Sequence, residues 1–316
     1  MRKKLVRNIF LLLLTAVFAG LIGGELFLRF RYGFCDAVLM KADPDYEYIA
    51  QPDQDRKRLG NQIKYNSCSM RTEELRNGSV RIICIGDSIL NGGTLTDHKY
   101  LATTLLSRRL SETLQKDIQV LNISAGSWGP DNCAAYLNKH GHFGAAALFL
   151  ITSSHDVKDT MTFVPVVGKL KYFPSKQYPL AIIELLDRYL HMDMSFFHKT
   201  KDEADADFRK QYNIEQTATA FNPGYAALVE YAKQHKIPLY FYLHAEQKEL
   251  KQNKYDPFGM EIIAFAEANK IPLFCDLKLG LSEAWFRDPI HYSSAGQQKM
   301  AEILYPEMEK ILKEIK

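Results

Sequence analysis

The amino-acid sequence predicts an α/β domain built on a doubly wound parallel sheet of about five strands, with helices on both faces. From residue 79 onward, short apolar runs of strand length alternate with helical patterns of about 10 to 15 residues. Such alternation is typical of a parallel sheet that helices cover on both sides. The composition agrees, because 47% hydrophobic and 24% charged residues are ordinary for a globular protein.

The strands and helices can be placed in order along the chain. The apolar runs of strand length are residues 80–85, 120–123, 147–151, 238–243 and 272–276. The helical patterns are residues 101–114, 131–140, 225–235, 260–269 and 295–316. Pro306 lies inside the last pattern and is expected to kink or divide that helix.

The first 30 residues are predicted to form a transmembrane signal anchor. Residues 1–8 are basic, and residues 9–30 are an apolar run of about the ~20 residues that a helix needs to cross a bilayer. The leading positive charge places residues 1–8 in the cytoplasm and the rest outside, in the periplasm or at the cell surface. A cleaved signal peptide is the alternative, because Val17 and Ala19 precede Gly20 at cleavage-site spacing. Both alternatives export the folded part.

Two segments do not follow the alternation. Residues 31–78 are polar, and we expect a juxtamembrane arm that packs partly on the catalytic domain, with a short strand at 63–65. Residues 157–217 interrupt the domain that spans 79–316. Insertions of this length are usually lids or binding loops, and this one leaves the third strand, so we expect it to overhang the site.

Charge and cysteine content exclude several classes of protein. The net charge is +3, and several of the cations lie in the first 31 residues, so the folded part lacks the clustered Lys and Arg of a nucleic-acid surface. The five cysteines show no CxxC spacing, which excludes a disulfide framework, although a Cys35–Cys68 bridge stays open. His140 and His142 have no Cys or carboxylate cluster beside them, so neither a metal nor a cofactor is expected.

The ends of the strands carry the residues for chemistry, because ligands of open parallel sheets bind beyond the carboxyl ends of the strands. Ser88 follows the first strand in the sequence Gly86-Asp87-Ser88, and Asp288 and His291 precede the last helix. A serine is a good nucleophile only when a base accepts its proton and another group orients that base. The spacing of Asp288 and His291 allows both side chains to lie on one face of a turn. We therefore predict Ser88, His291 and Asp288 as the catalytic set.

An oxyanion hole is expected at the same strand ends. The N–H groups of Ser88 and Gly126 each lie just beyond a strand, where they can stabilise charge on a carbonyl oxygen. Structural alternatives exist for the catalytic set: Ser88 can cap a helix, Asp288 can cap the approach to the last helix, and His291 can be an exposed loop residue. Asp87 is expected to be a turn residue.

Together, the Gly86-Asp87-Ser88 block, the Gly126 block and the block from Asp288 to His291 resemble the SGNH, or GDSL, hydrolase superfamily. The resemblance covers about residues 79–316, with the insertion unmatched. It implies a flavodoxin-like, three-layer α/β/α sandwich. It also implies Ser88 as nucleophile, His291 as base, Asp288 as the group that orients it, and Ser88 and Gly126 as backbone oxyanion donors.

The sequence departs from this superfamily at one block. Its members usually supply an Asn side chain to the oxyanion hole from a Gly-x-Asn-Asp pattern, whereas this chain has Ser153-Ser154-His155-Asp156. His155 takes the Asn position. A neutral imidazole can donate one hydrogen bond, so His155 is a candidate oxyanion donor, and a differently arranged oxyanion hole is the alternative.

The expected function is that of a serine esterase that removes O-acetyl or other short acyl groups from carbohydrate through an acyl-Ser88 intermediate. Trp128 is a candidate for stacking on a sugar ring, with simple packing as the alternative, and His244 is a candidate pocket residue, with a half-buried strand end as the alternative. An O-acyltransferase acting on an envelope glycan uses the same acyl-enzyme. A third hypothesis is a non-catalytic glycan-binding protein on the same scaffold.

Overall fold

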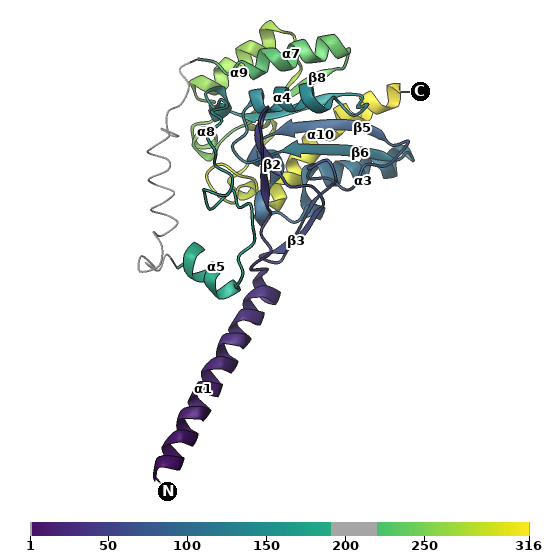
Figure 1. Cartoon of the computed structure of the whole chain (residues 1–316). Coiled ribbons are helices and arrows are strands. Elements are labelled where there is room, and N and C mark those ends of the chain that lie inside the picture. Colours follow the sequence, from purple (N-terminus) through teal and green to yellow (C-terminus); the bar gives the residue numbers. More distant parts are fainter. Residues whose placement is uncertain (1, 191–219, 316) are drawn as a thin grey trace.

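The computed structural model describes residues 2–190 and 220–315, and it contains the predicted sheet (Figure 1). The five strands are parallel and lie in the order β6-β5-β7-β8-β9. In chain order this is 2-1-3-4-5, the doubly wound order of flavodoxin-like folds, which confirms the predicted fold class. The strands are β5 (Val80–Gly86), β6 (Ile118–Ser124), β7 (Leu148–Ser153), β8 (Leu239–His244) and β9 (Leu273–Cys275).

Helices cover both faces of the sheet, as predicted. Figure 1 shows α4, α7 and α9 on one face and α3 and α10 on the other. Within these layers α4 packs against α7, and α3 packs against α10. The result is a three-layer α/β/α sandwich. Its helices are α3 (Ala102–Leu114), α4 (Pro130–His140), α7 (Gly224–His235), α9 (Pro257–Ala268) and α10 (Ser294–Glu314).

The strands of the sheet are rich in apolar residues, as is typical of strands with helices on both faces. Every residue of β6 and of β7 is buried. The expected division of the last helix at Pro306 is wrong, because α10 runs through this residue as one helix. Leu304 before the proline and Met308 after it are both fully buried, so both halves of the helix pack on the domain.

The arm at residues 31–78 is more ordered than the sequence predicts. It forms two antiparallel hairpins, and the second includes the strand expected at 63–65. Ile49 and Ile63 are fully buried, and the N–H of Met40 donates to the carbonyl of Pro174 in the insertion at 2.8 Å. The hairpin strands are β1 (Met40–Asp43), β2 (Glu47–Ala50), β3 (Gln54–Arg58) and β4 (Asn61–Tyr65).

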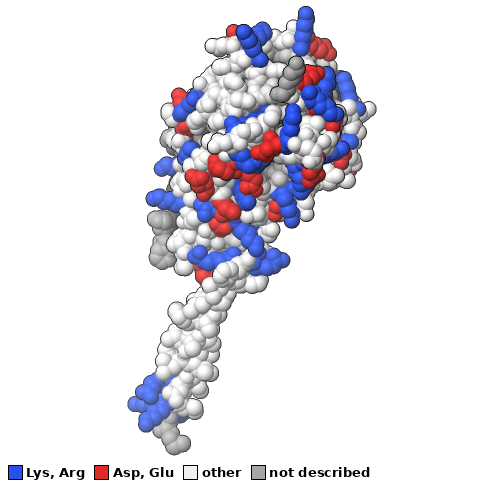
Figure 2. All heavy atoms as spheres, turned by 90° about the vertical axis from the view of Figure 1, so that its right-hand side faces the viewer, with Lys and Arg blue, Asp and Glu red and all other residues white. Residues whose placement is uncertain are grey.

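The N-terminal segment is a single long helix that stands away from the body (Figure 1). It comprises α1 (Arg2–Phe27) and a π-helical turn (Leu28–Tyr32), 31 residues with a mean hydropathy of 2.2 in the most apolar stretch, none of which is buried. Figure 2 shows Lys and Arg side chains at the free tip and again where the helix meets the body. The helix is therefore long and apolar enough to cross a membrane.

The insertion contacts the base of this helix. Glu25 accepts hydrogen bonds from the N–H groups of Ala181 and Ile182, at 2.8 and 3.0 Å, at the start of α5 (Ala181–Arg188). A carboxylate in the first turn of a helix satisfies N–H groups that have no partner inside it. This explains an acidic residue at the end of an apolar helix. Residues 191–217 of the predicted insertion lie outside the described residues.

The five cysteines are free, so the Cys35–Cys68 bridge is not formed. The two residues contact different parts of the molecule. The N–H of Cys35 donates to Glu184 of α5, whereas the carbonyl of Cys68 accepts from Tyr136 of α4.

Candidate active site

Ser88 is the first residue of a short helix, α2 (Ser88–Asn91), directly after β5. The preceding Asp87 caps this helix, because its Oδ1 accepts the N–H of Ile89 at 2.8 Å, in agreement with the expected turn role. Gly92 ends the helix with φ +71°, a conformation that a residue with a side chain rarely adopts. The short helix turns Ser88 out of the end of the sheet.

The structure brings the three predicted catalytic residues together. The Oγ of Ser88 lies 2.9 Å from Nε2 of His291, across 203 residues of sequence. On the other side of the ring, Nδ1 of His291 lies 2.9 Å from both carboxylate oxygens of Asp288. An Nδ1–H donated to Asp288 leaves Nε2 as an acceptor for the Ser88 hydroxyl, which is the arrangement that a general base needs.

The turn from Asp288 to His291 is held by its own carboxylate. Oδ1 of Asp288 accepts the backbone N–H groups of Ile290 and His291, at 3.0 and 2.8 Å. Burial alone would raise the pKa of Asp288, but these hydrogen bonds and the His291 side chain lower it below its ordinary value. Asp288 is therefore a stable anion beside the imidazole.

Arg287, which the sequence analysis did not single out, anchors the same loop. The guanidinium of Arg287 donates to the carbonyl of Gly92 at 2.7 Å and to Oγ1 of Thr96 at 3.1 Å. This joins the acid–base loop to the chain that follows Ser88. No sequence motif marks Arg287, because both contacts join segments about 190 residues apart in the chain.

His244 lies at the end of β8, but its side chain is fully buried and faces the interior. Its Nδ1 is 2.7 Å from Oδ2 of Asp276, and its Nε2 is 2.7 Å from the carbonyl of Ile290. Burial alone would lower the pKa of His244, but these two acceptors raise it above its ordinary value, which favours the doubly protonated ring. The expected substrate contact of His244 is wrong, because the residue instead ties β8 to the loop of Asp288 and His291.

Trp128 is also a packing residue rather than an exposed platform for a sugar. The residue is only 1% exposed, and its indole N–H donates to the carbonyl of Tyr48 at 2.9 Å. Its ring packs against those of Tyr46 and Tyr136. The expected stacking on a substrate is therefore wrong, since the ring faces are covered by the arm and by α4.

Gly126 follows β6 and borders the same cavity as Ser88. The cavity has a volume of about 610 Å³. The N–H of Ser88, at the first position of α2, has no partner within the helix, as is usual there. Gly126 has open space where a side chain would begin, so a substrate can approach its backbone. The carbonyl of Gly126 accepts from the Tyr48 hydroxyl at 2.9 Å, which holds the loop.

Asn91 and Arg71 are further residues of this region that the sequence analysis missed as functional. The Asn91 amide donates to the carbonyl and to Oγ of Ser124, each at 3.1 Å, which joins the Ser88 turn to the end of β6. Its Oδ1 accepts from the guanidinium of Arg71 at 3.3 Å. Asn91 directly follows the Ser88 block in the sequence, which is the signal that could have identified it.

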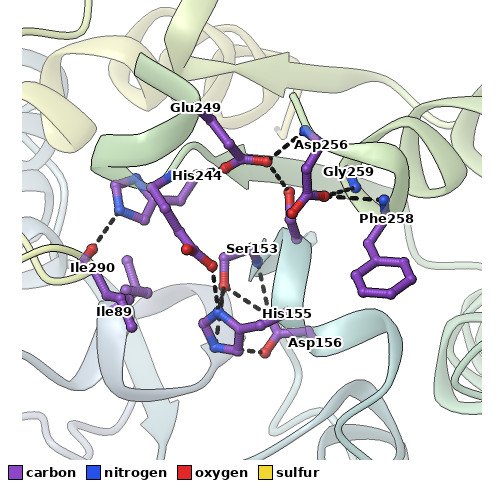
Figure 3. Close-up of polar contacts among 12 residues, drawn as sticks. Ile89, Ser153, His155, Asp156, His244, Glu249, Asp256, Phe258, Gly259 and Ile290 are labelled. Carbon is purple, nitrogen blue, oxygen red and sulfur yellow. Dashed lines mark hydrogen bonds and ion pairs between the residues drawn. The ribbon is translucent and has the colours of Figure 1, made fainter. Parts of the chain in front are cut away.

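His155 follows β7 but is surrounded by acidic side chains (Figure 3). Its Nδ1 lies 3.1 Å from Oε1 of Glu246, and its Nε2 lies 3.5 Å from Asp87 and 3.4 Å from Asp156. Burial alone would lower the pKa of His155, but Asp156, together with Asp87 and Glu246, raises it well above its ordinary value. The imidazole therefore contacts carboxylates at both ring nitrogens, and the role of His155 as an oxyanion donor stays a prediction.

The turn that carries His155 is fixed by the helices on its outer side (Figure 3). The hydroxyl of Ser154 donates to Glu249 at 2.5 Å, and Glu249 also accepts the N–H of Asp256 at 2.8 Å. Gly259 of α9 lies against Ser154 so closely that a Cβ there would be 2.4 Å from the hydroxyl. This packing leaves His155 little freedom to turn toward Ser88.

Asp87, His155 and Asp156 are a group that could hold a metal ion, since their ligand atoms lie within 4.8 Å of one another. The same atoms form the ion pairs described above. Burial and the neighbouring Asp87 raise the pKa of Asp156 to about 7, while His155 and hydrogen bonds from Ser153 and Thr152 oppose this rise.

Comparison with known proteins gives similarity in fold only. No protein-family profile and no curated protein sequence matches the chain. Among solved structures, the chain is similar to TesA (15% identity, TM-score 0.42, 73% of this chain and 99% of that chain). It is also similar to the acetyl xylan esterase AlAXEase, with 14% identity and a TM-score of 0.42 over 72% of this chain and 99% of that chain. A lipase/acylhydrolase from Enterococcus faecalis is similar as well, with 13% identity and a TM-score of 0.43 over 73% of this chain and 96% of that chain. The fold assignment itself follows from the strand order.

Proposed function

We propose that this chain is a serine esterase of the SGNH type that removes short acyl groups, such as O-acetyl, from carbohydrate. The observation that carries the proposal is the continuous hydrogen-bonded series from Ser88 through His291 to Asp288, with 2.9 Å at each step. These are the residues of the three blocks that resemble the superfamily. Their position at the carboxyl ends of the strands of a 2-1-3-4-5 sheet supports the same assignment.

The reaction then follows from the geometry. His291 takes the proton of the Ser88 hydroxyl at Nε2 while Oγ attacks the ester carbonyl. The N–H groups of Ser88 and Gly126 stabilise the negative charge on the carbonyl oxygen. The tetrahedral intermediate expels the alcohol, which takes the proton from His291, and Ser88 keeps the acyl group. A water molecule, deprotonated by His291, then attacks the acyl-Ser88, and the second tetrahedral intermediate releases the acid as His291 returns the proton to Oγ of Ser88.

We also propose that the chain is anchored in a membrane with its catalytic domain outside the cytoplasm. The apolar helix from Arg2 to Tyr32 and the basic residues at its leading end support this topology. Contacts of Glu25 with Ala181 and Ile182 join the helix to the folded domain, which favours an anchor that is retained after export.

Labelling of the full-length protein with a fluorophosphonate probe tests the nucleophile. Wild-type protein is expected to be labelled, and Ser88→Ala is expected not to be. Ser127→Ala is the matched control, since it removes a hydroxyl that borders the same cavity, and it should still be labelled. Equal labelling of wild type and Ser88→Ala would rule out Ser88 as the nucleophile.

Turnover assays then define the reaction. Acetylated xylo-oligosaccharide and 4-nitrophenyl acetate are suitable first substrates. Release of acetate that is unchanged by an added sugar acceptor supports an esterase. Transfer of the acetyl group to that acceptor in preference to water identifies an O-acyltransferase, which uses the same acyl-enzyme.

A further inference from the structure

The cavity beside Ser88 has an unbalanced charge. Its lining includes Arg58, Arg71, Lys171 and Arg188, whereas no Asp or Glu lines it in the part of the chain that the structure describes. The volume of about 610 Å³ lies within the range of ~300–1,000 Å³ that is usual for small-molecule sites. The cavity is therefore large enough for more of the substrate than its acyl group.

Arg71 is the most unusual of these cations. It is 1% exposed, and its guanidinium donates to Asn91, to the carbonyl of Gly93 and to the carbonyl of Thr96, all of which are neutral acceptors. Within residues 2–190 and 220–315, no carboxylate lies within ion-pair distance of it, and its Nε–H has no hydrogen-bond partner. Buried charges are normally paired, because an unpaired charge away from water costs free energy.

A second group of residues that line the cavity also has excess positive charge. Arg58 and Arg188 share one buried carboxylate, that of Glu184, at 2.5 and 3.1 Å. Two guanidinium groups and one carboxylate leave one positive charge. The carbonyl of Lys171 accepts a hydrogen bond from Arg188, and both residues belong to the insertion and line the cavity.

We infer that this cavity binds a substrate that carries negative charge close to its ester group, such as an acylated glycan with carboxylate or phosphate groups. Guanidinium groups suit both anions, because their N–H groups match the planar geometry of a carboxylate or phosphate. A bound anion would supply a counter-charge to Arg71 and would balance the excess positive charge of Arg58 and Arg188, which share Glu184. The inference rests on the proposed esterase function, and it adds a substrate class to that function.

The test compares charged and neutral substrates on the full chain in detergent. We expect kcat/KM to be higher for acetylated oligogalacturonate than for acetylated xylo-oligosaccharide. Arg188→Gln should lower the ratio of these two kcat/KM values about 10-fold or more, which corresponds to the loss of one hydrogen bond to a charged group. Arg108→Gln removes a cation on the exposed face of α3 and should leave the ratio as in wild type. If Arg188→Gln lowers the melting temperature, the same ratio of kcat/KM values is measured with Lys171→Gln instead.

A binding measurement keeps the inference separate from the esterase proposal. Ser88→Ala is titrated by calorimetry with oligogalacturonate, with a glycerol phosphate oligomer and with xylo-oligosaccharide, none of them acylated. Preferential binding of the first supports a carboxylated glycan, and preferential binding of the second supports a phosphate-bearing polymer. Binding of the neutral oligosaccharide as tightly as both anions, or a substrate ratio that Arg188→Gln leaves unchanged, would overturn the inference even if Ser88 is acylated.

Discussion

The ion pair between His244 and Asp276 can be tested by removing the imidazole. The ring is fully buried, and its two nitrogens are each 2.7 Å from an acceptor, the Asp276 carboxylate and the carbonyl of Ile290. His244→Ala deletes both hydrogen bonds and leaves a buried anion. Breaking a buried ion pair costs about 3–5 kcal/mol.

The lower end of that range applies here. Asp276 keeps three donors, the hydroxyls of Tyr292 and Tyr255 and the N–H of Ala245, so its charge remains partly satisfied. A loss of about 3 kcal/mol lowers the melting temperature of a domain of this size by about 6–12 °C. The loop of Asp288 and His291 loses an anchor at Ile290, and turnover should therefore fall about 10-fold or more.

The effect should also depend on pH. Burial alone would lower the pKa of His244, but Asp276 and the carbonyl of Ile290 raise it above its ordinary value. A histidine whose pKa is raised by folding makes its full contribution to the stability of the folded state at pH values below its unfolded-state pKa of about 6.5. This contribution is lost as the pH rises through the folded-state pKa. The difference in unfolding free energy between wild type and His244→Ala should therefore shrink at alkaline pH.

Calorimetry or denaturant unfolding at several pH values measures this difference. His235→Ala is the matched control, because it removes an exposed histidine at the end of α7 and should change the stability little. If the loss in His244→Ala is the same from pH 6 to pH 10, His244 is not held as a cation by Asp276. If the loss is below about 1 kcal/mol, the buried pair does not stabilise this protein.

Two further predictions concern residues beside the nucleophile. Asp288→Asn should lower kcat by about 10³-fold or more with little change in melting temperature. The reason is that an amide N–H facing Nδ1 favours the His291 tautomer that cannot accept the Ser88 proton. A small change in kcat would show that Asp288 does not orient the base. His155→Lys should retain more thermal stability than His155→Gln, since the positive charge beside Asp87 and Asp156 is kept, and equal melting temperatures of the two variants would contradict a charge role.

The sheet and the residues at its strand ends could be predicted because their signals are local. A short β-branched apolar run such as 80–85 already predicts a buried strand, and the alternation of such runs with helical patterns predicts helices on both faces. Ser88 follows directly from the end of β5, and the spacing of Asp288 and His291 fits a turn closed by a carboxylate. These positions need no knowledge of distant contacts.

The surroundings of these residues could not be predicted in the same way. In the sequence, His244 and Trp128 occupy positions that suit a pocket. They are buried by segments that meet them only in the folded chain: the arm covers Trp128, and the residues after β9 cover His244. His155 looks equivalent to a neutral donor in sequence. The carboxylates around it come from Asp156, its neighbour in the chain, and also from Asp87 and Glu246, which lie 68 and 91 residues away.

The anchoring of the acid–base loop shows how a short turn can hold catalytic geometry. Arg287 binds this loop to the carbonyl of Gly92, next to Ser88, and His244 binds it to β8 through the carbonyl of Ile290. Each contact places a charged group on a neutral carbonyl, away from Oγ of Ser88. Buried ion pairs contribute little net stability compared with apolar packing. The benefit of these contacts is therefore that they fix the position of the base, because a base held from two sides needs little reorganisation when charge develops at the ester. A loop fixed by one contact alone would keep the same three residues but would hold His291 less firmly toward Ser88.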